Sequence, residues 1–117
     1  MKKVELKDVK PYAAPGHFNM TALRLHAKGE TDCQGYWMGM SHFLPQGGAE
    51  LGAVPAEMVY FVLEGELTLY DEKKNKTVLK KWDSIHIAPG EVRSLINETN
   101  LPATQLVIGT YPPPPGK

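Results

Sequence analysis

The sequence predicts a single all-β domain folded as a barrel or a sandwich, and three observations lead to this prediction. The chain has 117 residues, which is long enough for one hydrophobic core and too short for two domains. Ten prolines and eleven glycines divide it into short apolar runs. No run repeats its apolar residues at helical spacing over a long stretch, so short strands joined by turns are expected.

Eight runs rich in Val, Ile, Leu, Tyr and Thr predict strands, and several alternate apolar with polar residues. They are residues 20–27, 36–44, 58–63, 66–71, 76–82, 84–88, 92–97 and 104–111. Turn residues separate them, for example at Lys28–Glu30, Pro45–Gly48 and Pro89–Gly90. Residues 1–19 lack a strong pattern and are expected to form an N-terminal arm beside a barrel of residues 20–111. Residues 112–117 begin with four prolines and predict an extended tail that cannot be a central strand.

Composition and charge exclude several classes of protein. Thirteen basic residues balance thirteen acidic ones, so nothing favours a nucleic acid or an anionic membrane as partner. The single cysteine, Cys33, excludes an internal disulfide and a cysteine-rich zinc site. No window approaches the roughly 18 apolar residues of a membrane-spanning helix, and the lysine-containing start lacks the apolar core of a signal peptide. We therefore expect a cytoplasmic domain.

Residues 45–97 resemble the cupin superfamily, whose signature consists of two blocks. In the first block, Gly65 within YFVLEGELTLY matches the closing glycine, and Pro45 matches the opening proline. In the second block, KWDSIHIAPGEVRSLIN, Gly90 and Asn97 match the family pattern. The resemblance implies a cupin fold, that is, a double-stranded β-helix (jelly-roll) barrel, and it implies a homodimer because cupins are commonly dimeric.

The family's four metal-ligand positions carry other residues in this chain. Counting from Gly65 places the family glutamate on Met58 and its first two histidines on Gly52 and Val54, and the last histidine falls on Arg93. None of the four supplies a ligand for a divalent first-row ion, and the guanidinium brings a permanent positive charge. The sequence therefore predicts a cupin without a metal cofactor.

Strand alternation indicates which side chains share the barrel interior with Met58. If Met58 points inward as its family counterpart does, Tyr60 does so too. On the earlier strand, Met38, Met40 and His42 share one face, and the residues between them share the other. We expect the methionine face to point inward, since it would form an apolar wall beside Met58. Arg93 would then hold a ligand carboxylate, unless Glu50 or Glu57 pairs with it internally.

Two histidines are candidates for a functional role. His42 is expected near the cavity mouth, and His86, between Ile85 and Ile87, either lines the cavity or faces solvent. His17 and His26 are expected at the surface. An alternative divalent transition-metal site would need His42, His86 and Glu50 together, although their spacing has no ligand signature.

Three hypotheses for function follow. The leading one is a metal-independent cupin that binds a small carboxylate-bearing or aromatic metabolite inside the barrel. The predicted binding residues are Arg93, Met58, Tyr60, Met38, Met40, His42 and His86. If the protein is an enzyme, isomerase-, lyase- or hydrolase-type proton transfer by His42 or Tyr60 is expected. The alternatives are a dioxygenase- or decarboxylase-like metalloenzyme with shifted ligands, and a non-catalytic ligand-sensing or assembly module.

Overall fold

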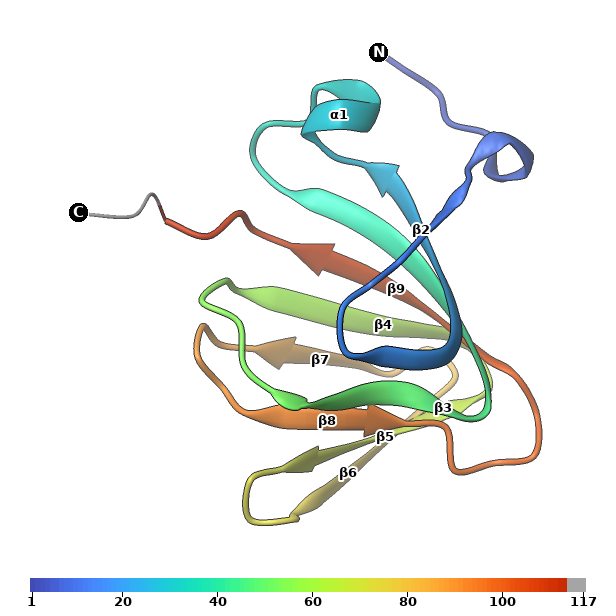
Figure 1. The fold of residues 1–117 in the computed structure, drawn as a ribbon, viewed down its shortest axis with the longest axis vertical. Helices are drawn as coiled ribbons and strands as arrows, with labels where there is room; N and C mark the ends of the chain where they lie inside the picture. Colours follow the sequence, from blue (N-terminus) through green and yellow to red (C-terminus); the bar gives the residue numbers. More distant parts are fainter. Residues whose placement is uncertain (114–117) are drawn as a thin grey trace.

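The computed structural model describes residues 1–113 and confirms the all-β prediction (Figure 1). Its strands are β1 (Pro11–Tyr12), β2 (His17–His26), β3 (Trp37–Gly52), β4 (Met58–Glu64), β5 (Glu66–Asp71), β6 (Lys76–Lys80), β7 (Ser84–Ile87), β8 (Arg93–Ile96) and β9 (Ala103–Gly109). Helical structure is limited to η1 (Leu6–Asp8) and α1 (Lys28–Thr31). No helix within residues 1–113 has the length and apolar character needed to cross a membrane.

The strands form one strongly curved, nearly closed barrel. Neighbouring strands follow the order β6-β5-β8-β3-β9-β4-β7, and β2 pairs with β3 while carrying β1 at its outer edge. All described pairs are antiparallel. The path leaves β6 and β7 as its two ends, and residues 81–83 join these two strands in the chain.

The long strand β3 lies between β8 and β9 and so joins two halves of the barrel, one with β6, β5 and β8 and the other with β9, β4 and β7. The turn expected at Pro45–Gly48, within this strand, is wrong. The strand continues through this segment and changes partner, from β9 along Trp37–Phe43 to β8 along Gly48–Gly52. Gln46 adopts a positive φ of 68° at the change of partner. A Cβ on Gly48 would lie 2.0 Å from the carbonyl oxygen of Leu95, so the close approach of β8 requires glycine.

The core lies between the two halves and corrects the predicted orientation of residues 37–43. Phe43 is 1% exposed and belongs to the core cluster together with Tyr60 and Val62. Because side chains alternate along a strand, Trp37, Gly39 and Ser41 share its inward face. Met38, Met40 and His42 therefore point outward, which is opposite to the expectation.

The N-terminal segment is more ordered than the sequence pattern suggested. Strand β1 pairs with β2, with Tyr12 opposite Ala22, and β2 begins at His17 inside the expected arm. The chain between them passes across the front of the barrel (Figure 1). Of the proline-rich tail, Pro112 and Pro113 continue from β9 without regular structure, and residues 114–117 lie outside the described residues.

Candidate functional site

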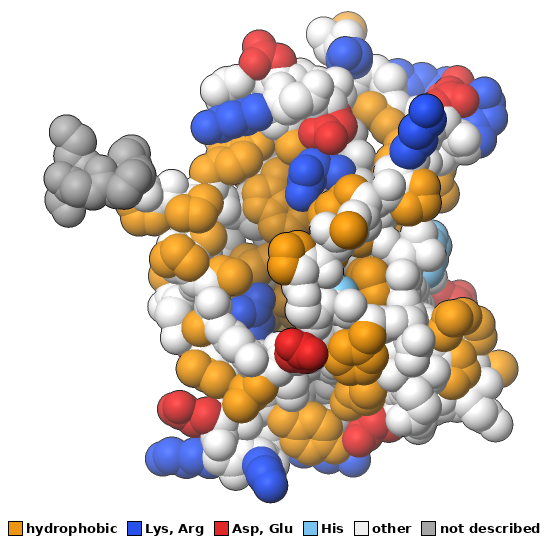
Figure 2. All heavy atoms as spheres, in the orientation of Figure 1, with side chains coloured by type: hydrophobic (Ala, Val, Ile, Leu, Met, Phe, Trp, Pro, Cys, Tyr) orange, Lys and Arg blue, Asp and Glu red, His pale blue; other side chains and the backbone are white. Residues whose placement is uncertain are grey.

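A cavity of about 320 Å³ opens at the mouth of the barrel. Its wall combines the start of β2, the end of β3, Tyr60 of β4 and the start of β8. The lining residues are Pro15–His17, Ala49–Val54, Tyr60 and Arg93–Leu95. Figure 2 shows the hollowed face of the molecule, with hydrophobic and charged side chains side by side around the hollow. The volume lies at the lower end of the range for small-molecule sites.

Arg93 is the central cation of this mouth. The Nη2 atom donates hydrogen bonds to the hydroxyl oxygen of Tyr60 at 3.0 Å and to Sδ of Met58 at 3.3 Å. The side chain is half-buried and makes no ion pair with a carboxylate of residues 1–113. The internal salt bridge considered for Glu57 is excluded, since that carboxylate bonds His86 instead. Glu50 lines the same cavity as Arg93 but lies beyond ion-pair distance.

The residues at the family's metal positions do not fit a metal ion. Gly52 has no side chain, and it lies opposite Arg93 in the β3–β8 register. Val54 is apolar, and the sulfur of Met58 already accepts a hydrogen bond from Arg93. The guanidinium lies beside the space that a cation would need, and no imidazole or carboxylate comes from these four positions.

The alternative metal site is contradicted by the positions of its three residues. Within residues 1–113, no three His, Cys, Asp or Glu side chains are grouped so that they could hold an ion. His42 bonds Oγ1 of Thr104 through Nδ1 at 2.8 Å on the outward face of β3. His86 bonds Glu57, and Glu50 lies at the barrel mouth. A shifted ligand set of these residues is therefore not formed.

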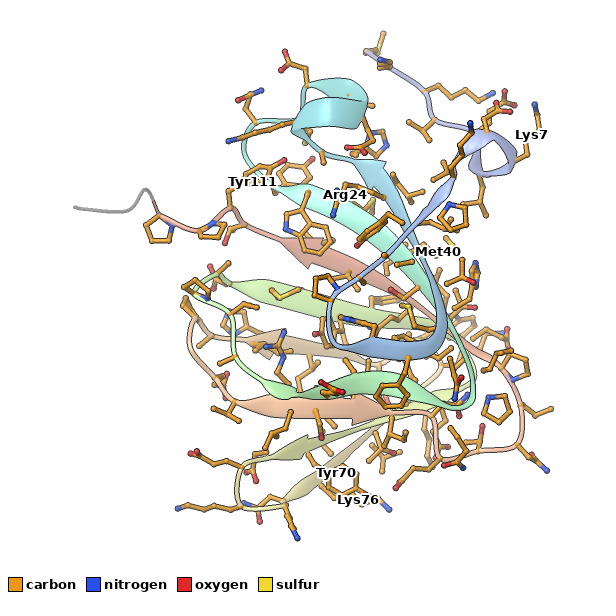
Figure 3. All side chains as sticks on the ribbon, viewed as in Figure 1. Lys7, Arg24, Met40, Tyr70, Lys76 and Tyr111 are labelled. Carbon is orange, nitrogen blue, oxygen red and sulfur yellow. The ribbon has the colours of Figure 1, made fainter. Side chains whose placement is uncertain are left out.

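Three residues predicted to line the barrel lie outside it. Met38 contributes to an outer depression together with Ile108, and Met40 lies opposite Leu106 on the outward face (Figure 3 labels Met40). His42 has the same orientation and has no place in the barrel-mouth chemistry. The methionine wall beside Met58 is therefore wrong, and Met58 and Tyr60 are packed in the interior as expected.

His86 is at the surface rather than inside the barrel. Its Nε2 bonds the carboxylate of Glu57, and both side chains are about half exposed. His86 nevertheless lines a smaller cavity of about 160 Å³, which Arg93 also lines. Arg93 thus contacts both cavities at this end of the barrel.

Two residues that line the barrel mouth, His17 and Glu50, are not among the predicted binding residues. His17, expected at the surface, is exposed but lies at the start of β2 and lines the cavity. Its Nδ1 bonds the carbonyl oxygen of Pro15 at 2.8 Å, so Nδ1 carries the proton and Nε2 of the neutral ring is free to accept one. Glu50 has no side-chain hydrogen bond or ion pair with another residue of 1–113, and it lines the same cavity. No local motif marks this pair.

Comparison with known proteins agrees with the architecture. Residues 40–109 match the cupin domain family. A β-D-galactosidase of Mycobacterium tuberculosis is 36% identical over 112 residues, covering 96% of both chains. The polyketide cyclase RemF from Streptomyces resistomycificus is 22% identical with a TM-score of 0.84, covering 97% of this chain and 82% of its own. A sugar phosphate isomerase from Silicibacter pomeroyi is 21% identical with a TM-score of 0.78, covering 96% of this chain and 77% of its own. Because the cupin domain family matches more than half of this chain, the chain belongs to the cupin family.

Proposed function

We propose that this protein binds a small carboxylate-bearing metabolite in the mouth of the barrel and acts on it by proton transfer, without a metal at the family positions. The proposal rests on the burial and the hydrogen-bond partners of Arg93. The guanidinium is half-buried in the cavity wall, donates only to a hydroxyl and a thioether, and faces no carboxylate within ion-pair distance among residues 1–113.

A half-buried arginine without an anionic partner favours an anionic ligand. Taking a guanidinium partly out of water costs free energy that a carboxylate in the same place offsets. The planar fork of Arg93 can donate two parallel N–H bonds to such a carboxylate. Tyr60 and Met58 use Nη2, and they hold the guanidinium against the wall in a fixed orientation.

Proton transfer is supported by the other polar groups of the cavity. Nε2 of His17 and the carboxylate of Glu50 have no partner among residues 1–113 and line the same space as Arg93. The hydroxyl oxygen of Tyr60 accepts from Arg93, so its own proton is free to be donated to a ligand. In this scheme Arg93 orients the substrate, Glu50 or His17 removes a proton, and Tyr60 supplies one.

The test of binding uses Arg93→Gln beside Arg93→Lys. Lactate, malate and benzoate are titrated at millimolar concentration, and chemical-shift changes of the backbone amides around the cavity are followed by NMR. We expect Arg93→Gln to abolish binding, and Arg93→Lys to keep part of it because it keeps the charge but loses the fork. If none of the three probes binds the native protein, or if Arg93→Gln binds as the native protein does, the proposal fails.

Turnover and metal independence have separate readouts. Glu50→Gln and His17→Gln are expected to keep ligand binding and lower turnover, whereas saturable binding without turnover in the native protein supports a sensing module instead. Elemental analysis of untagged protein purified without chelators is expected to give transition metal far below one ion per chain. Stoichiometric metal would contradict the metal-independent part of the proposal.

A second candidate is glycoside hydrolysis, which is favoured by the relative named as a galactosidase. Most glycosidases use two carboxyl groups, and some use a tyrosine nucleophile with a carboxylate. Near the mouth, Asp71, Glu91 and Glu57 are engaged by Asn75, the backbone of Ala88 and His86. Glu50 and Tyr60 would therefore have to carry the reaction. Release of nitrophenol from a nitrophenyl β-galactoside by the native protein, lost in Glu50→Gln, would favour this candidate over the first.

A further inference from the structure

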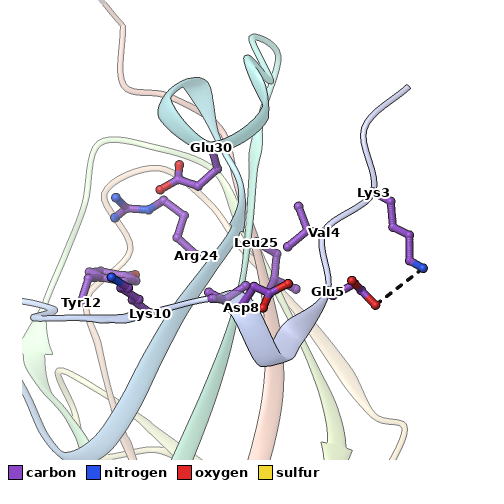
Figure 4. A pocket seen from close by; sticks show the side chains of 10 residues that line it. Lys3, Val4, Glu5, Asp8, Lys10, Tyr12, Arg24, Leu25 and Glu30 are labelled. Atoms are coloured by element: carbon purple, nitrogen blue, oxygen red, sulfur yellow. Dashed lines mark ion pairs between the residues drawn. The ribbon is translucent and has the colours of Figure 1, made fainter.

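A second groove lies beside α1, away from the barrel mouth. It comprises two cavities of about 480 and 410 Å³ that share Arg24 and Glu30 in their walls. The larger cavity also includes Trp37, Lys28 and Tyr111. Figure 4 shows the smaller one, with Arg24 beside Tyr12 and Glu30 turned to the same side of β2. No lining residue is common to this groove and the barrel-mouth cavity.

Trp37 forms a flat floor in this groove. A Cβ on Gly109 would lie 2.6–2.7 Å from three indole atoms of Trp37, and a Cβ on Gly39 would lie 3.4 Å from a fourth. The indole therefore packs directly on the glycine backbone of β3 and β9. Trp37 is partly buried against the core cluster and also lines the larger cavity. An indole held in this way can offer its exposed part to a ring-shaped ligand for stacking.

Two cations stand at fixed positions around this floor. The guanidinium of Arg24 stacks 4.2 Å from the centroid of the Tyr12 ring, and Nζ of Lys28 lies 4.4 Å from that of Tyr111. Tyr111 is itself held, since its hydroxyl donates to the carbonyl oxygen of Cys33 and accepts from the backbone N–H of Lys28. Figure 3 shows Arg24 and Tyr111 near one another at the upper end of the sheet. Stacking uses the face of a guanidinium and leaves its in-plane donors free.

The charged side chains that line the larger cavity are not paired with one another, whereas Lys3 and Glu5 of the smaller cavity form an ion pair at 3.8 Å. Within residues 1–113, neither Arg24, Lys28 nor the carboxylate of Glu30 makes an ion pair, although all three line the larger cavity. Two cations and one carboxylate leave a net positive charge, which favours an anionic substituent. The carboxylate accepts hydrogen bonds only, so it requires a ligand that also offers donors such as hydroxyl groups.

We propose that this groove binds a single sugar ring that carries one carboxylate or phosphate group. The ring stacks on Trp37, its anionic group lies between Arg24 and Lys28, and a ring hydroxyl donates to Glu30. An aromatic acid such as benzoate would stack but would offer Glu30 no donor. The inference concerns a separate site and does not depend on the chemistry proposed for the barrel mouth.

The experiment reads the fluorescence of Trp37 directly. The chain has two tryptophans, and Trp82 is 70% exposed on a loop, so Trp82→Phe leaves Trp37 as the sole indole. The Trp82→Phe variant is titrated with glucuronate, glucose 6-phosphate, glucose and benzoate. We expect a saturable change with glucuronate or glucose 6-phosphate, and affinity at least about tenfold weaker for glucose and for benzoate, equivalent to about 1.4 kcal/mol. No saturable response to either sugar anion, or equal affinity for glucose, would overturn the proposal.

Variants in the same background locate the response. Arg24→Gln is expected to weaken binding of the sugar anion at least about tenfold, as a lost charge-assisted contact requires. Lys76→Gln is the matched control, because Lys76 is an exposed cation that pairs with Glu98, and neither residue lines the groove. Arg93→Gln separates the two sites. Unchanged binding in Arg24→Gln, or loss of the response in Arg93→Gln, would place the ligand elsewhere, and thermal melting of each variant verifies that it is folded.

Discussion

Arg93 and Tyr60 form a hydrogen bond of 3.0 Å between β8 and β4, two strands that are not neighbours in the sheet. Two further strands, β3 and β9, separate them along the path of hydrogen-bonded pairs. The bond therefore crosses the barrel interior and connects its two halves at the open end. Sheet pairing alone does not bring these halves together at this point, so Tyr60 has a role in stability as well as in the proposed site.

Removal of the Tyr60 hydroxyl tests this role. Tyr60→Phe keeps the buried ring but leaves the Nη2 donor of Arg93 with the weak acceptor Met58 alone. We expect the free energy of unfolding to fall by about 1 kcal/mol. Urea denaturation measures it, and Tyr70→Phe is the control, since the Tyr70 hydroxyl bonds Glu98 at the surface. Equal losses in the two variants would contradict the role assigned to the interior bond.

Trp82 is held in a backbone conformation that favours glycine. Its φ is 74° and its side chain is 70% exposed, so little packing offsets the strain. Trp82→Gly and Trp82→Ala both remove the indole, but only glycine relieves the left-handed φ. We expect the glycine variant to be more stable than the alanine variant by about 1 kcal/mol, measured by thermal unfolding. An alanine variant that is equally stable would show that the strain is not present.

The carboxylate of Asp71, in the β5–β6 turn, is expected to make the stability of the fold depend on pH. The side-chain amide of Asn75 and then the backbone N–H groups of Asn75 and Lys73 bond this carboxylate and lower its pKa below the ordinary aspartate value. A pKa that is lower in the folded state than in the unfolded state gives stability above the unfolded value of about 3.9, and this stability is lost as pH falls through the folded value.

The comparison of native protein with Asp71→Asn measures this effect. The native protein is expected to be the more stable of the two near neutral pH, and the difference should shrink as the pH falls below about 4, where the native carboxylate becomes protonated. Guanidinium denaturation at a series of pH values gives the difference. Asp83→Asn serves as a second turn variant for reference. A difference between native and Asp71→Asn that stays constant through this range would exclude the linkage.

Gln105 carries a buried carbonyl oxygen without a partner. The residue is 2% exposed, and Oε1 has no hydrogen bond to the rest of residues 1–113. An unsatisfied buried acceptor costs about 1–3 kcal/mol. Gln105→Met has similar volume and no such group, so we expect the free energy of unfolding to rise by about 1 kcal/mol. A lower free energy of unfolding in Gln105→Met, measured by chemical denaturation, would mean that Oε1 has a hydrogen-bond partner in the native protein.

Asn97 is the opposite case, because all its polar atoms are used. It is fully buried; Nδ2 donates to the carbonyl oxygens of Phe43 and Leu101, and Oδ1 accepts from Thr99. Asn97→Leu would remove the side-chain donor to the carbonyl oxygen of Phe43, leave that of Leu101 with Thr99 Oγ1 alone, and take the acceptor from the N–H of Thr99. We expect a loss of about 3 kcal/mol or more, seen as a lower urea midpoint, whereas Asn100→Leu on the exposed loop is expected to change little. A mild effect at Asn97 would show that solvent reaches these carbonyl groups.

Local pattern was sufficient for most of the fold because strand formation depends on neighbouring residues. Each of the eight predicted runs corresponds to an observed strand, and Gly65 and Gly90 have the positive φ that their turns require. Segment Pro45–Gly48 was interpreted as a turn because proline and glycine usually end strands. In the barrel β3 instead continues through this segment and changes its partner from β9 to β8. The expected homodimer and cytoplasmic location stay predictions.

The sequence by itself determined where the strands lie along the chain and which residues replace the family's metal ligands, since both depend on residue type and spacing. It also placed Arg93, Met58 and Tyr60 in the barrel. Only the tertiary structure decided that Met38, Met40 and His42 point outward and that His17 and Glu50 line the same cavity. Alternation with a period of two fixes which residues share a face but not which face is covered. That choice depends on strands far apart in the chain.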